Sequence, residues 1–206
     1  MRIKESIWRN HRRATLAGIM ASLALLSGCN AVIRPKMPES SATLVQAAPP
    51  TGGVGLAAVK DGRSGASGGG VGAAGVEIQS DLGDYVHNGF ANGLSHKGLQ
   101  VVDTKASTNA QGVKRTVVVT VQSASVSTID ALLQPATANV AVAVQVYDPD
   151  QKVIFAQTYT GTNRETLGLH GQAGYDENSG RIVAAAADSA VEQALADPNF
   201  QKAING

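Results

Sequence analysis

The chain is poor in cysteine and in aromatic residues. Cys29 is its only cysteine among 206 residues, and Phe, Tyr and Trp together make up 4%. A single cysteine excludes an intramolecular disulfide, so the core alone must hold the folded domain together. The scarcity of aromatic side chains argues against a surface on which sugars or nucleic-acid bases stack. Cys29 itself could be a reactive thiol, a metal ligand, a buried apolar residue or a point of lipid attachment.

The residues before Cys29 have the composition of an export signal. Residues 1–13 carry five basic side chains and one acid, and residues 14–26 (ATLAGIMASLALL) carry no charge. This apolar run is too short for a membrane-spanning helix, which needs about 20 residues. It has no polar face, which argues against an amphipathic helix buried in a domain. A basic segment, a short apolar run and small residues before a cleavage point are typical of a signal peptide, here residues 1–28.

The motif Leu26-Ser27-Gly28-Cys29 resembles the lipobox of bacterial lipoproteins. The resemblance implies that diacylglycerol is added to the Cys29 thiol, that the chain is cleaved between Gly28 and Cys29, and that the new amino terminus is acylated. Several acyl chains together give a stable membrane anchor, whereas one gives a marginal anchor. Asn30 follows the cysteine in place of aspartate, which resembles the outer-membrane address of enteric-type sorting. We therefore expect an outer-membrane lipoprotein whose domain faces the periplasm.

The charge balance changes once residues 1–28 are removed. They hold five of the 17 basic residues and one of the 16 acidic residues, which leaves 12 basic against 15 acidic residues, a net charge of −3. The remaining chain has no basic cluster of the kind that binds nucleic acid. We therefore expect a membrane contact through the lipid and no nucleic-acid partner.

Residues 29–53 are predicted to form a flexible tether. Residues 30–53 contain four prolines and no sustained hydrophobic periodicity, which argues against a packed element. A coil of about 24 residues spans on the order of 25–30 Å, enough to hold a domain away from a membrane. Residues 41–46 (SATLVQ) could instead form an edge strand. A single folded domain is expected over residues 54–206.

The domain is predicted to begin with a β-α-β unit. Residues 54–59 (VGLAAV) suit a buried strand, and a glycine-rich loop follows at residues 61–75. Residues 70–75 match the dinucleotide-binding fingerprint only as text, because they do not follow a strand directly and no acid lies about 20 residues later. An amphipathic helix is predicted for residues 81–97, and residues 99–103 (LQVVD) then form a strand. The apolar stripe of that helix recurs every four residues, at Leu82, Val86, Phe90 and Leu94.

Three long strands and a helix complete the prediction. In residues 115–127 and 138–148, valine alternates with small or polar residues, the pattern of a strand with one face against a core. Residues 148–151 (DPDQ) predict a turn, and residues 152–162 return as a third antiparallel strand. The alanine-rich stretch after residue 178 predicts a helix that ends at Pro198.

Together these elements predict an α+β fold, a two-layer sandwich in which a mostly antiparallel sheet carries two helices on one face. The layout resembles the YajG-like family of bacterial lipoproteins. The resemblance lies in the signal peptide, the lipobox, VKDGR at residues 59–63, Val71-Gly72 and a β-α-β-β-β-α order. It implies a fold and an envelope location rather than a reaction.

Asp61 and Arg63, inside VKDGR, are the candidate site residues of the domain. Two residues apart in an extended chain, they lie on the same side. We expect them to pair or to cap a turn, with contact to a partner protein as the alternative.

The histidines and acids of the domain do not suggest a metal site. His87 and His96 are nine residues apart on the predicted helix, so they point in directions about 180° apart and cannot share a metal. His170 is predicted to lie in a solvated glycine-rich loop with the nearby residues 175–177 (YDE), without a convergent set of ligands. Asp148 and Asp150 alternate as in a calcium loop but lack its glycine and terminal glutamate.

No constellation of a nucleophile with a base and an orienting residue is evident in the sequence. We expect a non-enzymatic envelope lipoprotein without a cofactor, a protein-binding or structural component of an outer-membrane-associated assembly. One alternative is a module that binds a small ligand or lipid between the helices and the sheet. An enzyme that acts on cell-wall material, with His170 in its site, has the least support.

Overall fold

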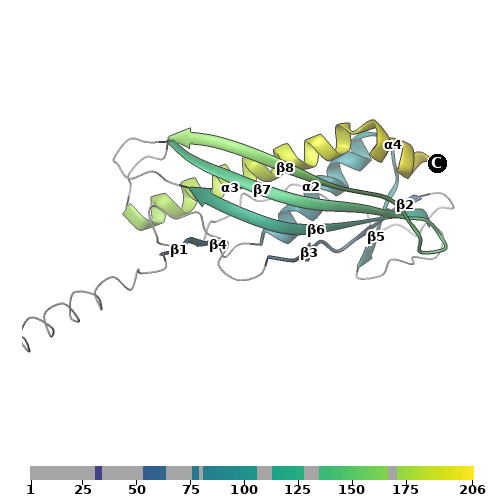
Figure 1. Ribbon diagram of the computed structural model, residues 1–206, viewed down its shortest axis with the longest axis horizontal. Coiled ribbons are helices and arrows are strands. Elements are labelled where there is room, and N and C mark those ends of the chain that lie inside the picture. Colours follow the sequence, from purple (N-terminus) through teal and green to yellow (C-terminus); the bar gives the residue numbers. More distant parts are fainter. Residues whose placement is uncertain are drawn as a thin grey trace, which may run out of the picture. The chain divides into compact units, whose positions relative to one another are not determined.

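The computed structural model describes residues 31–33, 53–63, 76–78, 81–105, 113–127, 135–166 and 171–206. Within these residues the fold is α+β, with a mixed open sheet of six strands and three helices (Figure 1). The sheet strands are β2 (Gly53–Ala57), β3 (Lys60–Asp61), β5 (Val101–Lys105), β6 (Val113–Ser127), β7 (Pro135–Tyr147) and β8 (Val153–Thr166). The helices are α2 (Leu82–His96), α3 (Gly171–Ala196) and α4 (Pro198–Asn205).

The sheet has the strand order β5-β2-β6-β7-β8, with β3 also pairing with β6. β6, β7 and β8 form the predicted antiparallel series, but β2 lies parallel to both β5 and β6. The sheet is therefore mixed rather than mostly antiparallel, because the connection from β2 to β5 crosses over through α2 and brings the chain back in the same direction. The predicted β-α-β-β-β-α order is also one strand short, because four strands, β5 to β8, lie between α2 and α3.

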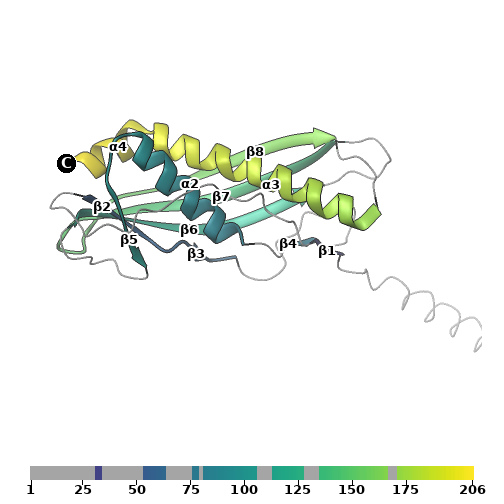
Figure 2. The same cartoon turned by 180° about the vertical axis from the view of Figure 1, so that it is seen from behind.

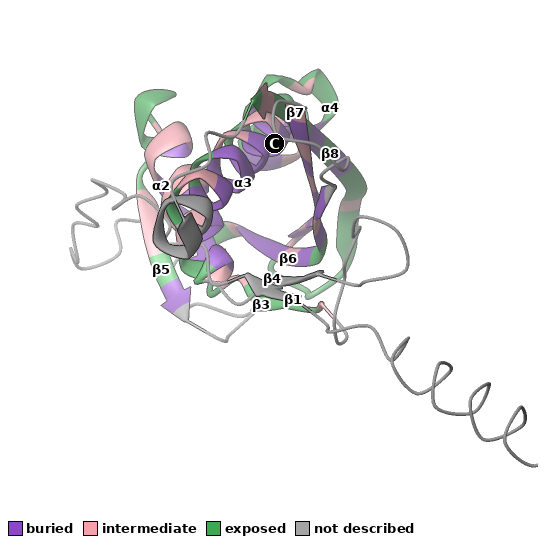
Figure 3. Cartoon of the chain, turned by 90° about the vertical axis from the view of Figure 1, so that its left-hand side faces the viewer, coloured by how far each residue is buried: buried purple, intermediate pink, exposed green. Residues whose placement is uncertain are grey.

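The core confirms the alternating pattern of the long strands. In β7 every second residue from Ala136 to Val146 is buried, and the partners Val117, Val119 and Val121 in β6 are fully buried. All four residues of the predicted α2 stripe are fully buried as well. Figure 3 shows these buried faces of the sheet and the helices turned toward one another. The two expected helices α2 and α3 lie side by side on one face of the sheet (Figure 2).

The end of α2 follows the predicted pattern. Gly98 has a φ of 79°, a left-handed conformation that favours glycine. The Gly98 N–H donates to the Ser95 carbonyl and the Leu99 N–H donates to the Leu94 carbonyl. This pair of bonds is the Schellman motif, which satisfies carbonyl groups that the helix leaves without a partner.

The C-terminal helical region differs from the prediction at both ends. α3 begins at Gly171, so Tyr175, Asp176 and Glu177 belong to its first turns rather than to a loop. Glycine has a low helix propensity, so the glycines near this end argue against a helix in the sequence. Tertiary packing nevertheless supports the helix in the folded chain. Pro198 does end α3, but it also starts the short helix α4.

Backbone contact joins α3 to the edge strand β8. A Cβ atom placed on Gly161 would lie 1.9 Å from the Ala186 carbonyl oxygen and 2.5 Å from the Ala190 amide nitrogen. Helix and strand therefore approach as closely as only glycine permits. On the other side of α3, the Tyr85 hydroxyl donates to the Asp188 carboxylate at 2.9 Å and fixes α2 against α3.

Several predictions fall outside the residues described above. They concern Gly28 and Cys29 with the signal peptide, the edge strand at residues 41–46, the loop residues 64–75 and His170. Within the predicted tether, residues 31–33 form the short strand β1 (Ala31–Ile33), which pairs in parallel with β4 (Val76–Ile78). In the described segments, no helix combines the length and the apolar character needed to cross a membrane.

Candidate functional site: the β8 edge and the adjoining pocket

β8 forms one edge of the sheet and is 14 residues long. Within the described part of the chain it pairs with β7 alone. Every second residue of an edge strand turns its N–H and C=O groups away from its neighbour, where another strand can bind them. In the part of the chain that the structure describes, the outer side of β8 therefore offers backbone hydrogen-bonding groups to another strand.

α3 already supplies a donor to the middle of this edge strand. The Gln193 side chain donates from Nε2 to the Thr160 carbonyl at 3.2 Å, next to the close approach at Gly161. Beyond this point, Arg181 of α3 forms an ion pair with Glu165. The N-terminal part of β8, residues 153–158, forms no such hydrogen bond or ion pair with α3 within the part of the chain that the structure describes.

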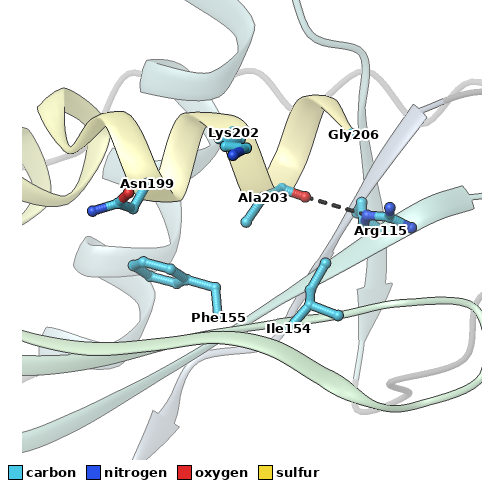
Figure 4. Close-up of a pocket in the computed structure, with 7 residues that line it drawn as sticks. All are labelled: Arg115, Ile154, Phe155, Asn199, Lys202, Ala203 and Gly206. Carbon is cyan, nitrogen blue, oxygen red and sulfur yellow. Dashed lines mark hydrogen bonds between the residues drawn. The ribbon is translucent and has the colours of Figure 1, made fainter.

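A β-bulge lies at the start of β8. Tyr147 pairs with Val153 and Val146 pairs with Phe155, so Ile154 has no partner opposite it in β7. An extra residue of this kind bends the strand and redirects a side chain. In Figure 4, Ile154 and Phe155 both point toward α4, although consecutive residues of a regular strand point to opposite faces.

The redirected side chain lines a surface pocket of about 320 Å³ between α4 and the start of β8 (Figure 4). Ile154 and Phe155 give the pocket an apolar side, and two cationic side chains enter it from other elements. The lining residues are Arg115, Ile154, Phe155, Asn199, Lys202, Ala203 and Gly206. A pocket that combines apolar and cationic groups suits a ligand with an apolar part and an anionic group.

Arg115 is held in place from two sides. Its Nε donates to the Ala203 carbonyl at 3.2 Å and its Nη1 donates to the Lys114 carbonyl at 2.9 Å. The first bond places a positive charge at the C-terminal end of α4, where it is favourable. Within the described residues, neither Arg115 nor Lys202 has an acidic partner.

α4 forms the opposite wall of the pocket and is fixed by its first turn. Asp197 caps the helix by accepting from the N–H groups of Asn199 and Phe200, and Pro198 occupies the first helical position. The Tyr159 hydroxyl of β8 donates to the same Asp197 carboxylate at 2.6 Å. This hydrogen bond from Tyr159, together with the backbone N–H groups, holds the pKa of Asp197 below its usual value. Burial, in turn, raises the pKa of Tyr159, which stays neutral.

The predicted pairing of Asp61 with Arg63 is confirmed. The Arg63 Nε donates to Asp61 Oδ1 at 2.8 Å and to Oδ2 at 3.1 Å, at the end of β3. The hydrogen bond from Arg63 lowers the pKa of Asp61. The Arg63 side chain is only 9% exposed, whereas that of Asp61 is 42% exposed. The pair lies at the strand β3 beside β6 and does not line the β8 pocket; its contact with a partner protein stays a prediction.

The other candidate residues do not converge. His87 is buried on α2, where its Nε2 has no hydrogen-bond partner in the described part, and His96 is exposed at the helix end. Asp148 belongs to the predicted hairpin turn, since its carboxylate accepts from the Lys152 N–H at 2.9 Å. Among the residues that the structure describes, no three His, Cys, Asp or Glu side chains are close enough to hold a metal ion.

The pocket residues were not predicted from the sequence. One signal for them exists: Val153, Ile154 and Phe155 are three consecutive apolar residues, and they interrupt the period-2 alternation of β8. Such an interruption in a strand is consistent with a bulge. The positions of Arg115 and Lys202 beside it depend on the tertiary fold.

Comparisons with known proteins assign no family to this chain. No protein-family model matches the sequence, and no curated protein is significantly similar to it. Among solved structures, a DUF330 protein from Xanthomonas campestris has a TM-score of 0.43 at 13% identity, covering 85% of this chain and 93% of its own. A minor lipoprotein from Acinetobacter baumannii has a TM-score of 0.44 at 12% identity, covering 72% and 92% respectively. Both are distant similarities of architecture.

Proposed function

We propose that this protein is a lipid-anchored lipoprotein of the bacterial outer membrane that binds another envelope protein and catalyses no reaction. The lipobox-like motif that ends at Cys29 supports the anchor and the location. The partner binds by adding a strand to the sheet at β8, in the role of an accessory or structural component of an outer-membrane-associated assembly. The observation that carries the binding mode is the long edge strand β8, which pairs only with β7 within the described residues.

The composition of β8 favours strand addition. Natural edge strands are commonly protected from pairing by lysine, by proline, by bulges or by very short length. β8 has 14 residues, contains neither lysine nor proline, and has its bulge only at the first residues. An incoming strand would gain backbone hydrogen bonds along residues 153–158, and side-chain contacts would give specificity.

Crosslinking in cells tests this binding mode. A photo-crosslinking amino acid at Ala156 or Thr158, both exposed on β8, is expected to trap one defined protein. The matched control position is Asp84, which is exposed on α2 and far in sequence from the edge. Adducts of the same size from both β8 positions and none from Asp84 support the proposal. A partner captured from Asp84 but from neither β8 position contradicts it.

The anchor gives a separate prediction. Cys29→Ala removes the thiol that would accept diacylglycerol, so the variant is expected to accumulate as a larger, uncleaved precursor without lipid label. The measurement is metabolic labelling with a radioactive or clickable fatty acid, followed by electrophoresis. Ser27→Ala, which keeps a small residue before the cleavage point, serves as the control and should be labelled and processed. Lipid label on the Cys29→Ala variant would show that the anchor assignment is wrong.

A small-ligand module is the second candidate, because the described residues include the pocket between α4 and β8. At Gly161 the backbones of α3 and β8 are in direct contact, so there is no room for a ligand between them at that point. The pocket would therefore be the binding place, and the experiment below distinguishes the two candidates.

A further inference from the structure

We propose that the pocket beside β8 binds an acidic side chain of the incoming strand, so that the partner segment is extended and carries an apolar residue two positions away from a glutamate or aspartate, on the same face. This inference rests on the strand addition proposed above. It identifies the chemistry of the partner, whereas the unpaired edge by itself would accept almost any extended backbone.

The pocket lies where it could contact the side chains of such a strand. Two of its lining residues, Ile154 and Phe155, belong to β8 itself, at the start of the half that α3 leaves uncontacted. A strand paired with residues 153–158 would lie directly beside these two lining residues. Its side chains alternate between the two faces of the sheet, so every second one points toward the face on which α4 lies.

Two large apolar residues at the pocket or directly beside it are exposed to solvent. Val153 and Ile154 are 42% and 40% exposed, and they are the large hydrophobic residues that stand out as exposed in the described part of the chain. They are consecutive and lie at the bulge, where Ile154 is directed toward α4 (Figure 4). An apolar residue of the incoming strand would remove both from water, which is favourable in proportion to the area buried.

The positive charges at the pocket favour the binding of an anion. Arg115 and Lys202 carry positive charges into it without an acidic partner in the described residues. The two protein contacts of Arg115 are to carbonyl oxygens, which orient its guanidinium but leave its charge uncompensated. A planar guanidinium binds a carboxylate through charge-assisted hydrogen bonds, and an ammonium group nearby adds to the attraction.

The test uses two fluorescein-labelled octapeptides of alternating threonine and valine, one with a single isoleucine–threonine–glutamate segment and one with isoleucine–threonine–glutamine in its place. Both are titrated into the mature lipidated protein in detergent micelles, and binding is followed by fluorescence anisotropy. Hydrogen exchange of the backbone amides in residues 153–158 reports strand pairing independently. We expect both peptides to protect these amides, and the glutamate peptide to bind about tenfold more tightly.

Charge variants locate the effect. Lys202→Gln should remove a large part of the preference for the glutamate peptide, and Arg115→Gln combined with Lys202→Gln should abolish it. Because Arg115 also holds the Ala203 carbonyl, Lys202→Gln alone is the cleaner variant. Lys114→Gln is the matched control, since Lys114 is an exposed cation next to Arg115 that does not line the pocket. This control should keep affinity within about twofold of the original, as expected for a solvent-exposed charge.

Each other outcome has a definite meaning. Equal binding of the two peptides with protection of β8 overturns the role of the pocket and leaves strand addition standing. An equal loss from Lys114→Gln and Lys202→Gln also overturns it, since the preference would then come from general charge. If neither peptide protects β8 but sodium laurate binds with an affinity that depends on Lys202, strand addition fails and the pocket is a small-ligand site.

Discussion

Gly161→Ala is expected to lower the free energy of unfolding by about 3 kcal/mol, the upper part of the range for overpacked cores. The new methyl group would lie 1.9 Å from the Ala186 carbonyl oxygen and 2.5 Å from the Ala190 nitrogen. Both atoms belong to the backbone of α3, so no side-chain rotation can relieve the clash. The helix must shift away from β8 as a unit, and that shift loosens the buried contacts of Ile182, Ala186 and Ala190.

Urea unfolding followed by circular dichroism measures this effect. Gly89→Ala is a matched control, because it makes the same chemical change within α2, at another contact with α3. There the new Cβ would lie 3.5 Å from Val191 Cγ2, an ordinary van der Waals distance. Removing a glycine from a helix interior stabilises by roughly 0.5–1 kcal/mol, so the two substitutions should shift the midpoint in opposite directions. Equal midpoints for Gly161→Ala and the original protein would show that the contact at Gly161 is not as close as the structure places it.

The contrast between these two glycines shows what local sequence pattern can predict. The stripe from Leu82 to Leu94 and the alternation from Val140 to Val146 identify core-facing positions correctly, because each depends on the geometry of a single helix or strand. A glycine within a strand indicates a bulge or a close approach, but it does not say which element approaches. That Gly161 meets α3 depends on tertiary packing.

The parallel pairing of β2 with β6 and the last helix were missed for related reasons. All five residues of β2 are buried, so the strand has no alternating face to indicate its neighbours, and its pairing with β5 and β6 is non-local. Asp197-Pro198 carried a clear helix-start signal, an N-cap residue before a proline, which was interpreted only as the end of α3. The same dipeptide serves both purposes in the structure.

The candidate site was predictable only in its local part. Asp61 and Arg63 pair as expected because two residues in an extended chain are enough to place them together. The pocket, in contrast, combines β6, a bulge of β8 and α4, three elements whose contact no local pattern encodes. Its recognition residues, Arg115 and Lys202, are 87 positions apart in the sequence.

Phe200→Ala is expected to destabilise the protein by about 3 kcal/mol or more, as found when large aromatic residues are removed from cores. Phe200 is fully buried and joins two other elements through its ring. Its centroid lies 6.4 Å from that of Phe90 in an edge-on arrangement and 5.8 Å from that of Phe155 in a tilted one. α4 has only eight residues, too few to remain helical without tertiary contacts, so its position depends on this anchor.

The same substitution should also impair peptide binding, because α4 forms one wall of the pocket and Phe155 lines the other. Urea unfolding measures the stability, and anisotropy with the glutamate octapeptide measures the binding. Lys202→Ala, exposed on the same helix, separates the two effects: it should change stability by less than about 0.5 kcal/mol while weakening binding of the glutamate peptide. A Phe200→Ala variant that unfolds at the original midpoint and still binds the peptide would show that α4 holds the pocket without its aromatic anchor. Loss of both properties in Phe200→Ala, and of binding alone in Lys202→Ala, would establish that one short helix couples the core to the recognition surface.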